Sequence, residues 1–311
     1  MKPQVSVIIP VWNRVELVKR SLDSILHQTL KPSELIVVDN NSIDNTYRSV
    51  EEWMNRHIEE GIRFQLLREP RQGACAARQK GLESSNGEYI IFFDSDDVML
   101  PHLIEKAVKE AENFPEADVV CWKCRLNLLN GRHYIPPFNP GNALENHLIH
   151  SLLRTQGYMV KKSFLEEAGG WRKPVAVWND FELGLRLLLH DPKIQGINDV
   201  MAEIYSQKDS ITGPTFSSKE GEWESTLKEM EKEVMKSEHP AKNRIKKILN
   251  YRRAILGAQY YRERNQRGAE RLISETLIDK SFSEKTILQF AYNYTRMGLR
   301  GAWRFVRYAY K

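Results

Sequence analysis

Apolar segments of strand length alternate with helical segments over the first 130 residues, and this alternation restricts the fold more than any other feature. The predicted strands are 5–9, 34–38, 63–67 and 88–93. The predicted helices between them are 16–28, 43–59 and 74–84. Strands that alternate with helices form right-handed βαβ units. The sequence therefore predicts an α/β fold with a mostly parallel, Rossmann-like sheet and helices on both faces.

Polar residues follow three of the predicted strands, at positions 10–13, 39–41 and 94–97. In open parallel sheets, ligands bind in the crevice beyond the carboxyl ends of the strands. We therefore expect these three segments to lie along one edge of the sheet and to form a single binding crevice.

The third of these segments concentrates negative charge. The apolar run 89–93 is followed at once by Asp94, Ser95, Asp96 and Asp97. Carboxylates this close repel each other, and their burial is costly unless a cation or hydrogen-bond donors compensate. Such a loop suits a hard divalent cation, and the alternative is a solvated acidic turn before the next helix. The shared sheet edge favours the binding site.

Charge is distributed unevenly along the chain. Residues 241–311 carry 17 Lys/Arg against 5 Asp/Glu, whereas residues 1–240 carry 29 against 36. A basic region on an acidic body indicates a negatively charged partner, such as membrane phosphates, nucleic acid or an acidic substrate. The predicted regions are a main domain over 1–215, a charged connecting segment over 216–240 and a basic helical region over 241–311. Helices are expected at 219–239 (exposed), 243–264, 266–277 and 284–308.

No segment reaches the roughly 18 apolar residues that cross a bilayer, and residues 1–14 are too polar for a signal peptide. Three cysteines without a secretory signal indicate a reducing cytoplasm. Cys121 and Cys124 form a C-x-x-C motif within the extended segment 117–129, where residues three apart face opposite sides. We therefore expect neither a disulfide nor a shared metal site between them.

The pattern is irregular between residues 131 and 215, where three features carry information. His147 and His150 form an H-x-x-H pair, which is typical of packing or surface residues. Trp171 follows two glycines, an arrangement that suits either a lid over a ligand or a plug in the core. Asp180 stands near the start of a helix over 181–189, whose dipole favours an ionised carboxylate. It is therefore either a helix cap or a base.

Four motifs in the same order resemble those of family 2 glycosyltransferases. They are 5–14, 37–46, 73–79 and 87–97, and the resemblance extends over about residues 4–215. It implies a GT-A fold, to which the predicted helices of residues 241–311 would add a C-terminal helical extension. It also implies inverting transfer of one sugar from a nucleotide sugar, with a UDP-sugar favoured, to a glycan or lipid-linked acceptor in bacterial surface polysaccharide synthesis. Mn²⁺ or Mg²⁺ would bridge the diphosphate, and no nucleic acid would be a partner.

The resemblance also assigns roles to individual residues. Asp39 would contact the nucleobase, in a pocket shaped by Pro10 and Trp12. The residues implied in donor binding are Pro10, Trp12, Asn13, Asp39, Arg78, Asp94, Ser95 and Asp96. The metal ligands would be Asp94, Asp96 and Asp97. Asp180 would act as general base, and Arg186, Lys208 and Ser210 match further positions of the family.

The chemistry of sugar transfer suits these residue types by itself. A metal ion stabilises the charge of a leaving nucleoside diphosphate, and a base opposite the leaving group takes the hydroxyl proton. The chain departs from the family pattern at Asn40-Asn41, where Asp-Gly is usual, and at Asn179, where Glu is common. Gln259 begins a segment that lacks the Trp of processive members, which favours transfer of one sugar.

Two other classes of function stay open on the sequence. A nucleotidyltransferase shares this sort of fold but needs a Gly-rich basic loop after the first strand, which residues 10–14 lack. A non-catalytic nucleotide-sugar-binding protein would not need Asp180. The aromatic and basic segment 303–311 either packs on the protein or lies on an anionic membrane, which would place a cytoplasmic protein on the inner face of that membrane.

Overall fold

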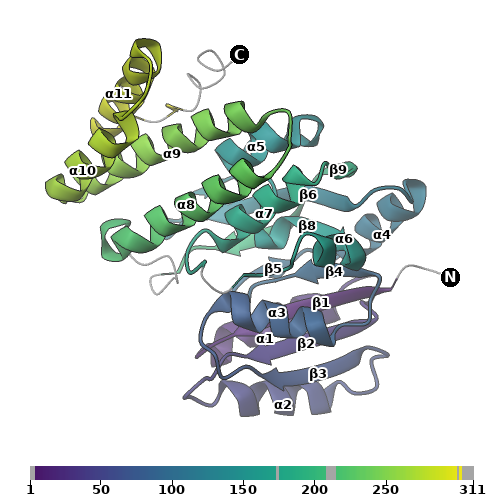
Figure 1. The fold of residues 1–311 in the computed structure, drawn as a ribbon. Coiled ribbons are helices and arrows are strands. Elements are labelled where there is room, and N and C mark those ends of the chain that lie inside the picture. The colour runs from purple at the N-terminus through teal and green to yellow at the C-terminus, as the bar shows by residue number, and fades with distance from the viewer. Residues whose placement is uncertain (1–3, 173–174, 208–214, 300, 303–311) are drawn as a thin grey trace. The chain divides into compact units, whose positions relative to one another are not determined.

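The computed structural model describes residues 4–172, 175–207, 215–299 and 301–302. The chain divides into two compact units, Met1–Gln207 and Lys208–Lys311. Each unit is described by itself (Figure 1). Two residues with implied roles, Lys208 and Ser210, lie outside the described residues.

One mixed sheet forms the centre of the first unit. Its order within the described residues is β3-β2-β1-β4-β8-β6-β9-β5, and β7 pairs with β6. The strands are β1 (Val5–Val11), β2 (Glu34–Asp39), β3 (Arg63–Arg68), β4 (Tyr89–Phe92), β5 (Val98–Met99), β6 (Val119–Asn127), β7 (His133–Tyr134), β8 (Tyr158–Lys161) and β9 (Ile194–Tyr205). All four strands predicted in the first 130 residues are present.

The predicted parallel arrangement holds for the half of the sheet built from β3, β2, β1 and β4. The other half is mixed, because β8 runs antiparallel to both β4 and β6 while β6 and β9 are parallel. This difference begins where the regular alternation of strand and helix signals ends. The parallel half brings the ends of β1 and β2 together, since Val11 is paired with Asp39.

Helices cover both faces of this sheet. They are α1 (Val15–Leu26), α2 (Thr46–Arg56), α3 (Ala74–Ser84), α4 (Leu103–Asn113), α5 (Ala143–His150), α6 (Lys162–Glu167) and α7 (Asn179–Leu189). One buried cluster joins α1, α2 and α4 to the sheet, and a second joins α3, α6 and α7 to the opposite face. Helix α3 lies very close to β1, because a Cβ on Gly81 would stand 2.4 Å from the side chain of Ile8.

The two cysteines of the C-x-x-C motif lie on opposite faces of β6, as predicted. Cys121 belongs to one buried cluster and Cys124 to the other, and both thiols are free. Burial raises the pKa of the Cys124 thiol to about 12. A thiol this resistant to ionisation is a poor nucleophile and a poor metal ligand.

Four helices make up the described part of the second unit. They are α8 (Glu220–Lys236), α9 (Lys242–Arg262), α10 (Gln266–Leu277) and α11 (Phe282–Arg296). The prediction of an exposed helix over 219–239 was wrong in one respect, because α8 buries Trp223, Leu227, Met230 and Val234. These residues recur at helical spacing, so they form one apolar stripe among many charges.

The last helix is shorter than predicted. Helix α11 ends at Arg296, and Gly298 follows with a φ of 82°, a conformation that commonly terminates helices. The basic aromatic segment 303–311 lies outside the described residues. Among the helices that are described, none is both long and apolar enough to cross a membrane.

Candidate active site

The loops that follow β1 and β2 are tied together by hydrogen bonds. The backbone N–H of Asn13 donates to Ser42 Oγ at 3.0 Å, and the backbone N–H of Ile43 donates to Asn13 Oδ1 at 2.9 Å. Asn13 and Asn41 both adopt the left-handed conformation, with φ of 49° and 63°. Asparagine tolerates this conformation better than most residues. Two of the predicted site segments are therefore held as one rigid element.

Asp39 presents a buried carboxylate oxygen at the end of β2. Its side chain is buried, and Oδ2 accepts a hydrogen bond from the backbone N–H of Ser42 at 3.2 Å. Within the described residues, Oδ1 is buried without a hydrogen-bond partner. An unsatisfied buried acceptor costs about 1–3 kcal/mol. This oxygen is therefore suited to accept a hydrogen bond from a ligand.

Asn40 connects the end of β2 to the start of α3. Its side-chain amide donates to the carbonyls of Glu69 (3.0 Å) and Arg71 (2.8 Å), and its Oδ1 accepts from the backbone N–H of Gly73 at 2.7 Å. Asn40, which stands where the family usually has Asp, thus has a structural role. Asn40 fixes the segment 69–73 that leads into α3, and α3 carries Arg78.

Two carboxylates of the acidic loop are held by side chains from distant segments. Asp94 accepts from Arg78 Nη2 and from Gln156 Nε2, each at 2.6 Å. The amide of Gln156 also donates to Asp97, whose other oxygen accepts from the backbone N–H of Tyr205 at 2.8 Å. The loop is therefore not a solvated acidic turn, because protein donors fix its carboxylates.

The third carboxylate, Asp96, is paired with a cation from the loop after β1. Arg14 Nη1 lies 2.5 Å from Asp96 Oδ2, and Arg20 donates to the backbone carbonyl of Asp96. Burial raises the pKa of Asp96, the charge of Asp94 adds to this shift, and Arg14 opposes it. Burial also raises the pKa of Asp97 well above its usual range. A further cation at this loop would relieve the repulsion.

The acidic loop fits a divalent metal ion only in part. The described residues contain no group of three or more His, Cys, Asp or Glu side chains arranged to hold a metal. Asp94 and Asp96 expose 28% and 18% of their side chains, whereas Asp97 is buried. Carboxylate oxygens are the donors that Mg²⁺ and Mn²⁺ prefer. A metal here would thus take one or two protein ligands and the rest from its other partners.

Asp180 stands in the first turn of α7, close to the acidic loop. The preceding residue Asn179 accepts a hydrogen bond from Arg78 Nη1 at 3.2 Å, and Arg78 is the residue that also binds Asp94. Asp180 Oδ1 accepts from the backbone N–H of Phe181 at 2.8 Å. Burial raises the pKa of Asp180, against the nearby positive charges of Arg78 and Arg154. Burial therefore outweighs these charges and the hydrogen bond from Phe181, so the carboxylate is not held ionised as the sequence suggested.

Residues 6–162 match the model of the family described as glycosyl transferase family 2. This chain belongs to family 2 of the glycosyltransferases. The resemblance read from its four motifs is thereby confirmed.

Curated relatives match about a third of the chain. The poly(ribitol-phosphate) β-N-acetylglucosaminyltransferase TarP of Staphylococcus aureus is 35% identical over 115 residues, 36% of this chain and 32% of TarP. The GalNAc(5)-diNAcBac-PP-undecaprenol β-1,3-glucosyltransferase of Campylobacter jejuni is 33% identical over 109 residues, 35% of each chain. The aligned part spans about a third of the length of these relatives.

A solved structure resembles the fold over almost the whole chain. S. aureus TarS 1–349 in complex with UDP-GlcNAc superposes with a TM-score of 0.71 at 17% identity, covering 99% of this chain and 91% of TarS 1–349. At this identity the likeness shows the fold alone. The predicted GT-A fold is confirmed.

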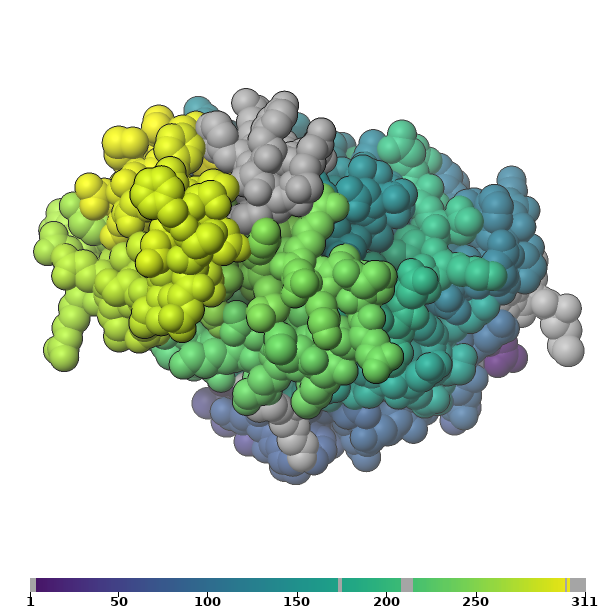
Figure 2. All heavy atoms as spheres, turned by 45° about the horizontal axis from the view of Figure 1, so that its top comes forward, coloured from purple at the N-terminus to yellow at the C-terminus, as the bar shows by residue number. Residues whose placement is uncertain are grey.

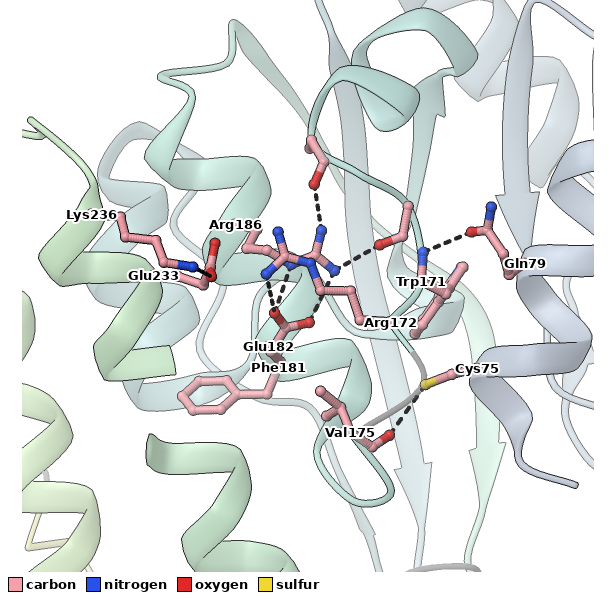
Figure 3. Close-up of polar contacts among 12 residues, drawn as sticks. Cys75, Gln79, Trp171, Arg172, Val175, Phe181, Glu182, Arg186, Glu233 and Lys236 are labelled. Atoms are coloured by element: carbon pink, nitrogen blue, oxygen red, sulfur yellow. Dashed lines mark hydrogen bonds and ion pairs between the residues drawn. The ribbon is translucent and has the colours of Figure 1, made fainter. Parts of the chain in front are cut away.

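Arg186, which matches a downstream arginine of family 2, has a structural role. Its guanidinium donates to Glu182 Oε1 and Oε2 at 2.6 and 3.0 Å, and to the carbonyls of Ala168 and Gly170 (Figure 3). Glu182 and Arg186 are both buried. The pair holds the glycine turn against α7 and thereby fixes the helix that carries Asp180.

Trp171 and His147 are packing residues. Trp171 is buried, with its ring edge-on to Phe92 at 5.1 Å, and Figure 3 shows its backbone N–H bonded to Gln79. Of the two alternatives for Trp171, the structure selects the core. His147 is buried and bonded to the carbonyl of Phe181, in agreement with a packing role for the H-x-x-H pair.

The remaining implied donor-binding residues of this family 2 chain lie at or near the same sheet edge. Pro10 is buried within β1 and is paired with Val38, whereas Trp12 exposes half of its side chain just beyond the strand. Ser95 is buried in the acidic loop. Arg78 faces Asp94, and its guanidinium lies 4.5 Å from the ring centre of Trp171. Arg78 thus holds the acidic loop in place.

Sequence reasoning missed the side chains that position the acidic loop. Arg14 is the last residue of the first motif, so a cation at the end of a ligand-binding segment was the available signal. Gln156 lies in a short 3₁₀ turn, Thr155–Gly157, outside all four motifs, and no sequence pattern marks it. Tyr205 contributes a backbone N–H, which any residue at the end of β9 would supply.

Proposed function

We propose that this chain transfers one sugar from a nucleoside diphosphate sugar to a hydroxyl group of an acceptor, with inversion at the anomeric carbon. One observation carries the proposal: Arg78 donates hydrogen bonds to both Asp94 and Asn179. This guanidinium links the acidic loop to the first turn of α7, where Asp180 lies. A donor-binding carboxylate and a candidate base therefore belong to one site.

The nucleobase would bind at Asp39. Its partnerless buried oxygen suits the ring N–H of uracil, which is a hydrogen-bond donor, and Trp12 lies next to the tied loops as an aromatic surface. A UDP-sugar is the favoured donor, and the TarS complex with UDP-GlcNAc supports this choice through its shared fold. Guanine also has ring N–H donors, so GDP-sugars must be compared directly.

Asp94 and Asp96 would hold Mn²⁺ or Mg²⁺ with the donor's diphosphate, because they are the exposed carboxylates of the loop. A metal bound there neutralises negative charge on the leaving diphosphate. Arg14 keeps Asp96 in place, and Gln156 orients both Asp94 and Asp97. These contacts preorganise the loop before the donor binds.

In the reaction itself, Asp180 would take the proton of the acceptor hydroxyl. The hydroxyl oxygen forms a bond to the anomeric carbon while the bond from that carbon to the phosphate oxygen breaks. The bonding electrons leave with the nucleoside diphosphate, and attack from the opposite side inverts the configuration. The raised pKa of Asp180 makes its carboxylate a stronger base than an exposed aspartate.

The acceptor would be a glycan or a lipid-linked glycan in bacterial surface polysaccharide synthesis. The names of the two curated relatives, one acting on poly(ribitol-phosphate) and one on a PP-undecaprenol glycan, support this class. We place the protein in the cytoplasm, where nucleotide sugars are made available to such acceptors.

A peripheral membrane contact is a second proposal about partners. Within the second unit, α11 exposes Phe282 (86%) and Phe290 (47%), and Met297 just beyond it is also exposed. This helix is the yellow region of the space-filling view (Figure 2). Exposed apolar residues on a basic unit suit an anionic membrane surface. If so, Phe282→Ser and Phe290→Ser weaken sedimentation with anionic liposomes, and truncation after Arg296 tests the tail by itself. Unchanged sedimentation in all of these variants would disprove the membrane contact.

Thermal stability measured with a panel of UDP-, GDP- and dTDP-sugars, with and without Mn²⁺, tests the donor site. At about 100 times the dissociation constant, a true donor adds about 2.7 kcal/mol of stability. Stabilisation by one nucleotide class, strengthened by metal, is the expected result. If no nucleotide sugar stabilises the protein, the donor site is wrongly assigned. Nucleotidyl transfer would instead appear as release of diphosphate from a nucleoside triphosphate.

A further inference from the structure

A hollow lies where β6 meets the loop before α5 and the segment that leads into the 3₁₀ turn Thr155–Gly157. It is shallow and open to solvent, and its cavity volume of about 10 Å³ is close to that of a single water site. Two cations, Lys123 and Arg154, line it together with Trp122 and the segment 136–138, which is Pro-Pro-Phe. Donor binding accounts for none of these residues.

Arg154 is built into this hollow. Its guanidinium donates to the carbonyl of His150 at 2.7 Å, and the side chain is half-buried. The stem of Arg154 passes so close to the following turn that a Cβ on Gly157 would stand 3.1 Å from its Cγ. Within the described residues, no carboxylate lies within ion-pair distance of Arg154. The positive charge is therefore held in place without an ion pair.

Lys123 supplies a second cation at the same place. The pairing of β6 with β9 shifts register on both sides of Lys123, between Trp122 and Lys123 and again between Lys123 and Cys124. Irregularities of this kind re-aim side chains and occur often beside active sites. In the described part of the chain Lys123 has no ion pair either. Two cations without ion pairs, next to apolar walls, suit an anion attached to a carbon skeleton.

The hollow is electrostatically coupled to the base. The positive charge of Arg154 lowers the pKa of Asp180, against the larger effect of burial. Contacts also connect the hollow to the acidic loop: Trp122, which lines it, donates its ring N–H to the carbonyl of Gln156 at 2.8 Å, and the amide of Gln156 binds Asp94. The donor diphosphate has its own place at the acidic loop, so the second anion belongs to the other substrate.

We propose that Arg154 and Lys123 bind a phosphate group of the acceptor substrate, and that this contact places the acceptor hydroxyl at Asp180. The inference rests on the proposed glycosyl transfer and specifies its acceptor as a phosphate-containing chain. The planar fork of Arg154 matches two oxygens of a phosphate, and Lys123 adds a point charge. The Pro-Pro-Phe wall would cover the carbon skeleton on one side.

Calorimetric titration with a glycerol-phosphate trimer, a soluble phosphodiester, tests the proposal. The donor site is first saturated with UDP and Mn²⁺, so that the probe's phosphates cannot enter it, and glycerol serves as the uncharged comparison. The unmodified chain is expected to bind the trimer and not glycerol. Arg154→Gln and Lys123→Gln should each weaken binding of the trimer by about tenfold, the loss of one charge-assisted contact.

Lys109→Gln is the matched control, because it removes the same charge from an exposed position of α4 without an ion pair in the described structure. It should bind the trimer as the unmodified chain does. Arg154→Lys keeps the charge and loses the fork, so an intermediate affinity is expected. This variant and Lys123→Gln keep the test valid if Arg154→Gln fails to fold.

Two outcomes separate the inference from the function on which it rests. If UDP binds and the trimer does not, or if all variants bind the trimer equally, the acceptor phosphate site is wrong and glycosyl transfer stands. If neither UDP nor any nucleotide sugar binds, the proposed function itself fails. Trimer that competes with UDP would show binding at the donor site and would also overturn the inference.

Discussion

Arg78 Nη2 donates to Asp94 Oδ1 at 2.6 Å, and this contact joins α3 to the loop after β4. The same guanidinium reaches Asn179 at 3.2 Å, so one buried side chain connects three segments of the site. A substitution at this position should therefore disturb both the stability of the protein and the geometry of its donor site.

Arg78→Ala is expected to lower the free energy of unfolding by about 1–3 kcal/mol, since it leaves Asp94 without a charge partner while solvent still screens that carboxylate in part. Donor affinity should fall as well, because Asp94 is freed to move. Urea unfolding and nucleotide titration measure the two effects. Arg78→Lys keeps the charge without the second contact, so it should recover part of the stability. Full stability in the Ala variant would contradict the linking role.

A second prediction concerns Asp39, whose substitution should weaken nucleotide binding but leave the stability of the protein nearly unchanged. Its Oδ1 has no partner in the described structure, so Asp39→Asn removes no contact from that oxygen. The free energy of unfolding should change by less than about 1 kcal/mol, whereas affinity for the nucleoside diphosphate should drop about tenfold or more. Asp199→Asn, at an exposed surface position, is the control. Equal affinity in all three proteins would rule out the nucleobase contact.

The main features of the fold could be predicted because periodicity reports local structure. The strands β1 to β4 and the helix α10 follow directly from apolar spacing. The buried stripe of α8 was obscured, because Trp223 and Leu227 stand among charged residues that lower the average hydrophobicity. Strand direction in the second half of the sheet depends on long-range pairing of β8 with β4 and β6, which no local pattern encodes.

The candidate site, like the fold, was predictable where a local sequence pattern marks the residue. Asp39, Asp94 and Asp180 sit next to strand ends or a helix start, where sequence patterns are informative. Gln156 and Arg154 sit in an irregular region and gain their meaning only from what they touch. Arg186 was assigned by resemblance alone, and its bonds to Glu182 give it a purely structural explanation.

The buried pair of Glu182 and Arg186 should contribute far more to stability than an exposed pair at the same helical spacing. Each side chain of the pair is 3% exposed, and Arg186→Met leaves Glu182 charged and buried. The expected cost is about 3–5 kcal/mol. Arg48→Met breaks an exposed pair with Glu52, and its expected cost is about 0.5 kcal/mol or less. Similar costs for the two variants, measured by urea unfolding, would refute the assignment.

The acidic loop should make the metal-free protein less stable as the pH rises. Burial raises the pKa of Asp97 and of Asp96, so between the ordinary aspartate pKa and the raised value the folded state holds more protons than the unfolded state. Stability is then fully present below that window and is lost as the pH rises through it. Asp97→Asn should flatten this part of the profile of unfolding free energy against pH. An unchanged profile would mean that Asp97 does not titrate there.

Asp180 should control turnover and not donor binding. Its carboxylate lies in the first turn of α7 and is linked to the donor loop through Asn179 and Arg78, so Asp180→Asn keeps the shape of the site while removing the base. We expect kcat to fall by about 10²–10⁴-fold, with an unchanged dissociation constant for the nucleotide sugar. Because burial raises the pKa of Asp180, kcat/KM of the unmodified enzyme should rise with pH through a midpoint above the ordinary aspartate value, and the variant should lack this rise. Near-normal turnover of Asp180→Asn would remove Asp180 as the base. Donor binding without turnover in the unmodified chain would instead favour sugar-nucleotide binding without catalysis.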